Sequence, residues 1–167
     1  MKKEVIYAST TGNTKLLAET IYHTLQGEKE LLPFHKDVKI DADILYIGYW
    51  VFEGTACKPI HDFLKTLHHQ KILLFGTMGA AENEAYQKMI MKNVEKNIAS
   101  DNDIMGHFLC QGKLASNMQA IYEEKLKRNP DDIHTQKQLE NFVASQAHPS
   151  KEDLENVKNW VLKYDKI

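Results

Sequence analysis

The chain has 167 residues, of which 43% are hydrophobic and 26% are charged, with a formal net charge of -2 at pH 7. This composition is sufficient for one domain with a full core, and it argues against binding to nucleic acid. No apolar run reaches the roughly 20 residues needed to cross a bilayer, and a first strand beginning by Val5 leaves no room for a signal peptide. Cys57 and Cys110 form no C-x-x-C pattern, as expected in a reducing compartment. We therefore expect a cytoplasmic protein without a membrane partner.

The first predicted element is a buried strand over 5–8, built from β-branched and aromatic residues. Small polar residues follow at once, and then a helical pattern of Leu17, Ile21 and Leu25. A strand that turns directly into a helix leaves backbone N–H groups unpaired at the positive end of the helix dipole. The loop therefore predicts a phosphate site formed by Ser9, Thr10, Thr11, Gly12, Asn13 and Thr14. The alternative is that Thr11 or Asn13 only caps the helix.

Further strands alternate with helical patterns along the next hundred residues. An apolar run containing Pro33 is typical of an edge strand, whereas the later runs are almost unbroken and indicate strands covered on both faces. The predicted strands are 30–34, 44–50, 71–75 and 103–110, and the predicted helices between them contain 60–67 and 86–98. This alternation predicts an α/β fold with a parallel sheet between two layers of helices.

The C-terminal third is long for so small a domain. Helical patterns begin near Met118 and near Leu139, with Pro130 between them. Ser150 followed by Asp153 resembles a capping box and predicts the start of a last helix. We expect that helix to pack on the sheet, and the segment 115–148 to be a helical elaboration of a single domain spanning 1–167.

Three loops, after Ala8, Trp50 and Phe75, emerge at the carboxyl edge of the predicted sheet, where such sheets bind ligands. The first is suited to a phosphate, and the Trp50 ring offers a flat surface for stacking, although Trp50 could instead be a core residue. The third, over 76–80, contains two glycines that allow close backbone approach to a ligand. A ligand with a phosphate at one end and a flat heteroaromatic ring at the other is a mononucleotide. FMN fits better than a dinucleotide, because no G-x-G-x-x-G follows a strand.

The segment Ser9-Thr10-Thr11-Gly12-Asn13-Thr14 resembles the Ser/Thr-x-Thr-Gly-x-Thr phosphate signature of the flavodoxin family. The resemblance covers Met1 to about Gly112 and the last helix. It implies a three-layer α/β/α sandwich with a five-stranded parallel sheet in the order 2-1-3-4-5 and FMN at the switch point. The stretches 48–50, 54–55 and 75–80 resemble a flavodoxin-like subfamily of anaerobic bacteria, some of whose members accompany bilirubin reductases.

This resemblance implies noncovalent FMN and an electron-transfer protein that shuttles electrons between a reductase and an acceptor enzyme. Beyond the phosphate loop it implies flavin contacts from Tyr49, Trp50, Val51, Gly54, Thr77, Met78, Gly79 and Ala80. Val51 stands where the family pattern has glycine, which argues against a peptide flip there. The alternative is an FMN-dependent NAD(P)H reductase that acts directly on a quinone, azo compound or tetrapyrrole. A carrier is favoured over a stand-alone enzyme.

Other chemistries on similar folds are disfavoured by specific residues. Ala8 and Ser9 stand where a phosphoacceptor receiver needs acidic residues, neither cysteine begins a C-x5-R phosphatase motif, and no P-loop glycine-lysine-Ser/Thr step exists. His68 and His69 are adjacent on a helix end without a further ligand, so no metal site is expected.

Overall fold

The computed structural model describes residues 1–166 and contains a twisted parallel sheet built from the apolar runs of the sequence. The five parallel strands lie in the order β2-β1-β3-β5-β6. They are β1 (Lys3–Tyr7), β2 (Lys29–Pro33), β3 (Ile44–Phe52), β5 (Lys71–Met78) and β6 (Asp103–Gln111). Counted among the parallel strands alone, this is the expected order 2-1-3-4-5, which is confirmed.

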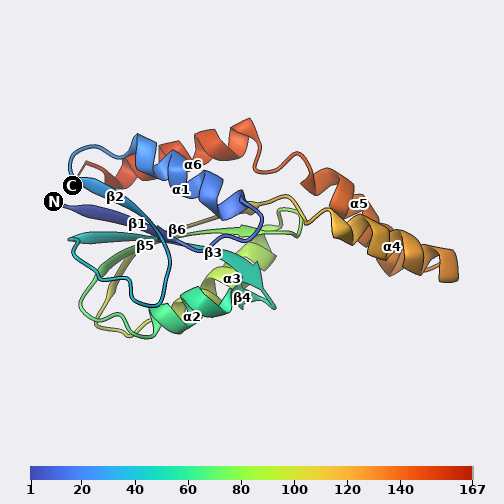
Figure 1. Ribbon diagram of the computed structural model, residues 1–167, viewed down its shortest axis with the longest axis horizontal. Helices are drawn as coiled ribbons and strands as arrows, with labels where there is room; N and C mark the ends of the chain where they lie inside the picture. The colour runs from blue at the N-terminus through green and yellow to red at the C-terminus, as the bar shows by residue number, and fades with distance from the viewer. Residues whose placement is uncertain (167) are drawn as a thin grey trace.

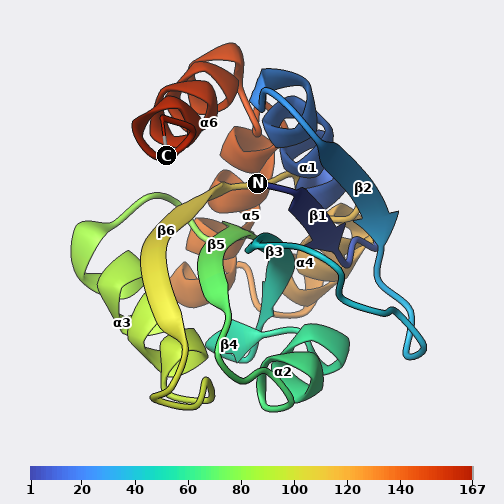
Figure 2. The same cartoon turned by 90° about the vertical axis from the view of Figure 1, so that its left-hand side faces the viewer.

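Helices cover both faces of the sheet, which confirms the three-layer sandwich (Figure 2). On one face lie α1 (Asn13–Thr24) and α6 (Lys151–Tyr164), and on the other lie α2 (Lys58–Leu64) and α3 (Glu84–Glu95). Coverage on both sides explains why residues 44–49 of β3 are all buried. β2 lies at the sheet edge with Pro33 exposed at its end, as the proline predicts.

The expected elaboration corresponds to two antiparallel helices, α4 (Asn117–Arg128) and α5 (Ile133–Ser145). We call this pair the α4–α5 arm, residues 117–145. The arm projects beyond the carboxyl edge of the sheet, away from both chain termini (Figure 1). After it, α6 begins with the predicted capping box: the Ser150 hydroxyl accepts from the Asp153 N–H, and the Asp153 carboxylate accepts from the Ser150 N–H.

Two strands are longer than expected, and this corrects the predicted loops over 51–57 and 76–80. β3 continues to Phe52 and returns as a short hairpin strand, β4 (Thr55–Ala56). The hairpin turn has positive φ at both Glu53 (48°) and Gly54 (79°), as expected for a two-residue β-hairpin. β5 stays paired with β6 as far as Met78, so that the third loop begins only at Gly79. Both strands continue further because their ends pair with neighbouring strands, and local sequence does not encode this pairing.

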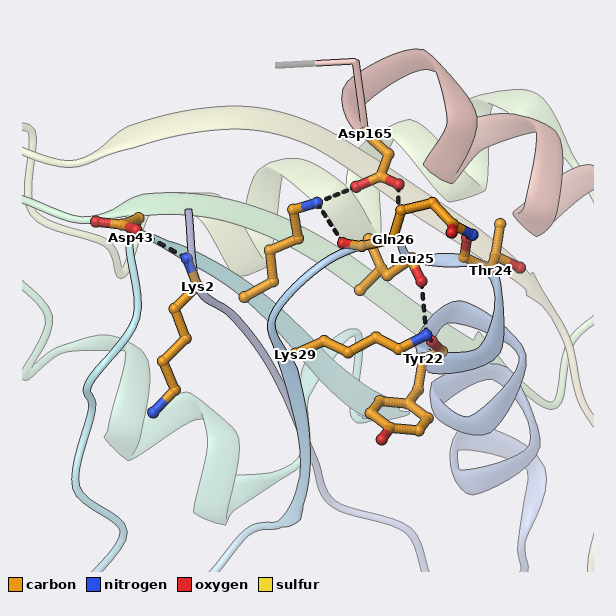
Figure 3. A network of polar contacts seen from close by, with 9 residues as sticks. Lys2, Tyr22, Thr24, Leu25, Gln26, Lys29, Asp43 and Asp165 are labelled. Atoms are coloured by element: carbon orange, nitrogen blue, oxygen red, sulfur yellow. Dashed lines mark hydrogen bonds and ion pairs between the residues drawn. The ribbon is translucent and has the colours of Figure 1, made fainter.

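A buried ion pair joins the two ends of the chain at the amino edge of the sheet. The ammonium of Lys3 contacts the Asp165 carboxylate, and the side chains are only 8% and 4% exposed. Asp165 also accepts from the backbone N–H of Gln26 (Figure 3). Nearby, Lys29 donates to two carbonyls at the end of α1, those of Tyr22 and Leu25. The pair therefore holds α6 against β1 and the end of α1.

No helix within residues 1–166 is both long enough and apolar enough to cross a membrane.

The Asp165→Asn substitution tests the buried pair, because it removes the charge but keeps an oxygen for the Gln26 N–H. It leaves the Lys3 ammonium buried without its counterion, so we expect the free energy of unfolding to fall by about 3 kcal/mol in urea titrations. The control is Asp62→Asn, which breaks the exposed Lys58–Asp62 pair and should give no measurable change. Equal stabilities of the two variants would contradict the role assigned to Lys3 and Asp165.

Candidate functional site

The loop between β1 and α1 is exposed at the carboxyl edge. Thr10, Thr11 and Gly12 are exposed, and Ser9 is half-buried. Gly12 occupies the N-cap position of α1 with φ of 93°, and it provides no side chain to cap the helix. Only its own N–H is satisfied locally, by donating to the Ser9 hydroxyl at 3.2 Å. Gly12 thus leaves the start of α1 without a side-chain cap.

Several backbone donors at this helix end are free. Within residues 1–166, no acceptor contacts the N–H groups of Thr10, Thr11, Asn13, Thr14 and Lys15. Unpaired N–H groups together with the positive end of the helix dipole form a site for an anion. The Lys15 ammonium is 3.8 Å from Glu19 and its side chain is 56% exposed, so it lies on the solvated face of α1.

A pocket of about 770 Å³ lies beside this loop. The loop and Lys15 form one side of it, and the remainder is formed by mostly apolar residues of β1, β2, β3, α2 and the segments that directly follow β1 and β2. The lining residues outside the loop are Tyr7, Ala8, Pro33, Phe34, His35, Trp50 and Pro59. This volume is within the usual range for cofactor sites, roughly 300–1,000 Å³.

Trp50 is half-buried and lines the pocket, as expected for a residue with one ring face available. Its position is fixed by β3, where its carbonyl accepts from the Cys57 N–H at 2.9 Å. Its ring also packs edge-on against Phe52, with centroids 5.7 Å apart and planes at 70°. Val51 pairs with Ala56 in the hairpin. The pocket therefore combines an anion site with an aromatic wall.

Thr14 differs from the other residues of the phosphate signature. Its side chain is buried, and its hydroxyl lies 3.0 Å from the Thr77 hydroxyl and 3.4 Å from the Tyr49 carbonyl oxygen. These bonds tie the start of α1 to β3 and β5. In this structure the Thr14 hydroxyl is thus engaged within the protein, and its backbone N–H is the donor left for an anion.

Among the predicted flavin contacts, Trp50 lines this pocket, whereas the following do not: Tyr49, Val51, Gly54, Thr77, Met78, Gly79 and Ala80. The Tyr49 side chain is fully buried and packs on Gly76, where an added Cβ would lie 2.5 Å from its ring. Burial raises the pKa of its phenol far above the usual range. Met78 is 2% exposed. The Gly54 carbonyl in the hairpin turn accepts from Asn93 of α3 at 2.9 Å.

A buried polar chain begins at the Tyr49 hydroxyl. The hydroxyl is 2.7 Å from Nε2 of His107, and Nδ1 of His107 is 2.8 Å from the Glu95 carboxylate. The chain satisfies a phenol and an imidazole inside the core between β3, β6 and α3. It accounts for the burial of Tyr49 and does not reach the pocket.

The third loop starts with Gly79 and Ala80, which are half-buried at the same edge of the sheet. The Gly79 carbonyl accepts from Gln111 at 3.1 Å and from Asn141 of α5 at 2.9 Å. The first loop is linked to the segment after β6, because Asn13 donates to the Lys113 carbonyl at 2.8 Å. The first loop is therefore attached to the chain segment that leads into the arm, and the third loop to β6 and to the arm itself.

The pocket residues Phe34, His35 and Pro59 were not among the residues expected from the sequence. Phe34 and His35 directly follow β2, so the rule that ligands bind at the carboxyl ends of parallel strands could have indicated them. Asn141 lies 62 residues from Gly79, and no spacing in the sequence relates the two. Within residues 1–166, no three His, Cys, Asp or Glu residues are placed to bind one metal ion.

Comparison with known proteins gives consistent results. The flavodoxin domain family matches residues 4–162. The chain is 43% identical to the flavodoxin-like domain-containing protein BilS of Clostridioides difficile, over 92% of this chain and 90% of the relative.

Solved structures show the same fold at low identity. Oxidised flavodoxin 1 of Bacillus cereus is 16% identical, with a TM-score of 0.59 over 99% of this chain and 98% of that one. A flavoprotein of Lactobacillus acidophilus, solved in complex with FMN, is 20% identical, with a TM-score of 0.51 over 65% of this chain and 92% of that one.

Both thiols are expected to be inert in the folded protein. Cys57 is fully buried and Cys110 is 2% exposed, and burial raises the pKa of both thiols. At pH 8 both groups are protonated, so iodoacetamide should modify neither until urea unfolds the chain, as followed by mass spectrometry. Rapid modification of either native thiol would show that its surroundings open readily.

Proposed function

This chain belongs to the flavodoxin family, and we propose that it is an FMN-binding electron-transfer protein that shuttles electrons between a reductase and an acceptor enzyme. FMN is the cofactor that flavodoxins hold at the switch between the first and third strands, and family membership supports it as the cofactor here. The observation that carries the proposal is the group of unpaired N–H donors beside a pocket with an aromatic wall.

The residues of the pocket fit both ends of FMN. The N–H groups of the first loop and of the first turn of α1, with the hydroxyls of Thr10 and Thr11, would hold the phosphate. Arg128 is the only arginine and is exposed on α4, so the anion is bound by amides and hydroxyls and not by a guanidinium. Trp50 would pack against the flavin ring.

Bound FMN supplies one- and two-electron chemistry, and the protein tunes it by stacking and by hydrogen bonds to the ring. The chain's own contribution is to hold the phosphate, to shield one side of the ring with Trp50 and to present backbone N–H groups from the third loop. The proposal includes a cytoplasmic location and a protein redox partner on each side of the transfer.

A second candidate is a reductase that acts directly on an organic substrate with NAD(P)H as donor. The observation that favours it is a crevice of about 350 Å³ between the third loop and the arm. Tyr122, His134 and Lys137 are among its lining residues, so it offers an aromatic surface and a lysine ammonium to a substrate that lies beside the third loop.

Two measurements separate these functions. The purified protein, reconstituted with FMN, should show the absorbance bands of bound oxidised flavin, and a protein that takes up no FMN would refute both candidates. A carrier should oxidise NAD(P)H in the presence of a quinone only when a separate flavodoxin reductase is added. Steady turnover without that reductase would favour the second candidate.

The Thr11→Val substitution tests the phosphate site. Thr11 is exposed, and its hydroxyl oxygen accepts from Asn13 at 3.2 Å, which leaves its O–H free to donate. Loss of one hydrogen bond to a charged group costs about 1.5–3 kcal/mol, so FMN should bind roughly ten- to a hundredfold more weakly in titrations of the apoprotein.

The matched control is Thr20→Val, which makes the same change within α1, where the hydroxyl donates to the Leu16 carbonyl at 2.8 Å. This variant should bind FMN as the unsubstituted protein does. Equal affinities of the Thr11 and Thr20 variants would remove the Thr11 hydroxyl from the site.

A further inference from the structure

Asn141 of α5 is hydrogen-bonded to the third loop and so joins the α4–α5 arm to it. Its amide Nδ2 donates to the Gly79 carbonyl at 2.9 Å, and its Oδ1 accepts from Nε2 of Gln111 at 3.2 Å. The same Gln111 nitrogen lies 3.1 Å from the Gly79 carbonyl, and Gln111 is only 3% exposed. Asn141, Gln111 and Gly79 thus form a closed polar triangle at the base of the arm.

Close packing also restrains the third loop at Gly79. A Cβ added to Gly79 would lie 2.4 Å from the Leu114 side chain, so the backbone there is in close contact with the chain that enters the arm. Leu114 in turn donates its N–H to the hydroxyl of Ser145, a fully buried residue at the end of α5. The conformation at Gly79 therefore depends on contacts from β6, from the segment that leads into the arm and, through Asn141, from the arm itself.

The Gly79 carbonyl and the Ala80 N–H belong to one peptide group. Two donors on the carbonyl withdraw electron density from that group, which makes its N–H a stronger donor, because successive hydrogen bonds polarise one another. Within residues 1–166, the Ala80 N–H has no acceptor, and Ala80 is half-buried at the carboxyl edge. A polarised, unpaired N–H is thus held at the edge where the flavin ring is proposed to lie.

We propose that Asn141 of the arm is a positioning residue for the flavin, which acts through the Gly79–Ala80 peptide group. This inference rests on the proposed function, in which the third loop lies against the FMN ring and its Ala80 N–H donates to a ring oxygen or nitrogen. The ring carries more negative charge when reduced, so a stronger and better placed donor favours the reduced form. Asn141 therefore increases FMN affinity and raises the midpoint potential.

The test compares Asn141→Asp with Gln138→Glu. The first substitution removes the amide donor to Gly79 and keeps an oxygen for Gln111. The second makes the same chemical change on the same helix, at a residue that lines the same crevice but forms no bond to Gly79. FMN affinity is measured by titration of each apoprotein, and the midpoint potential of the bound flavin by dye equilibration.

We expect Asn141→Asp to weaken FMN binding about tenfold and to shift the midpoint potential to more negative values. Gln138→Glu should stay within about twofold in affinity with an unchanged potential. Asn141→Leu, which removes the donor without adding a charge, should shift both quantities in the same direction as Asn141→Asp. If a urea titration shows that Asn141→Asp is not folded, Asn141→Leu takes its place in the comparison with Gln138→Glu.

The measurements distinguish a failure of the proposed function from a failure of the role proposed for Asn141. If the unsubstituted protein binds no FMN, the proposed function is wrong. If it binds FMN and the Asn141 variants match Gln138→Glu in affinity and potential, the role of Asn141 is wrong and the proposed function stands. A purely structural role would lower stability and affinity but leave the potential of the remaining bound flavin unchanged, and this result would also overturn the inference.

Discussion

The site depends on one helix end that the protein does not cap. α1 begins after Gly12 in a left-handed conformation, and no side chain accepts from the first N–H groups of the helix. Side chains cap α3, α5 and α6, at Asn83, Asp132 and Ser150, whereas α2 and α4, like α1, have no side-chain cap. The chain therefore contains residues able to cap a helix and does not use them at α1. Because the N-cap residue is glycine, the missing side-chain cap destabilises the helix by only about a few tenths of a kcal/mol, and an anion bound there would offset that cost.

The same helix end is held rigidly despite being open. The Thr14 hydroxyl is bonded to Thr77, and Asn13 reaches across to the Lys113 carbonyl. The first turn of α1 is thus fixed to β5 and to the segment after β6, while its N–H groups point to no protein acceptor. A preorganised set of donors binds an anion without paying to order the loop.

The arm helps to hold a loop at the carboxyl edge of the sheet. Loops at the carboxyl edge of a parallel sheet are normally held by the strands alone, and here the third loop is also bonded to a helix 62 residues away in the chain. The contact joins the arm to the carboxyl edge of the sheet, although the arm itself projects away from the sheet (Figure 1).

The sequence by itself determined the α/β class, the sheet order that the flavodoxin resemblance implies and the capping box at Ser150. These features follow from local patterns, because burial on two faces requires continuous apolar runs and a helix start requires particular residues. Local patterns failed where pairing between distant strands decided the outcome, as in the extension of β3 to Phe52 and of β5 to Met78.

Only the tertiary structure decided which side chains face the pocket. Tyr49 and Trp50 are adjacent in sequence and aromatic, and alternation along a strand sends one into the core and leaves the other at the pocket. It likewise decided that Thr14 bonds to Thr77 and that Asn141 reaches Gly79. Such contacts depend on where separate elements meet in space, and no spacing within one segment of the chain encodes them.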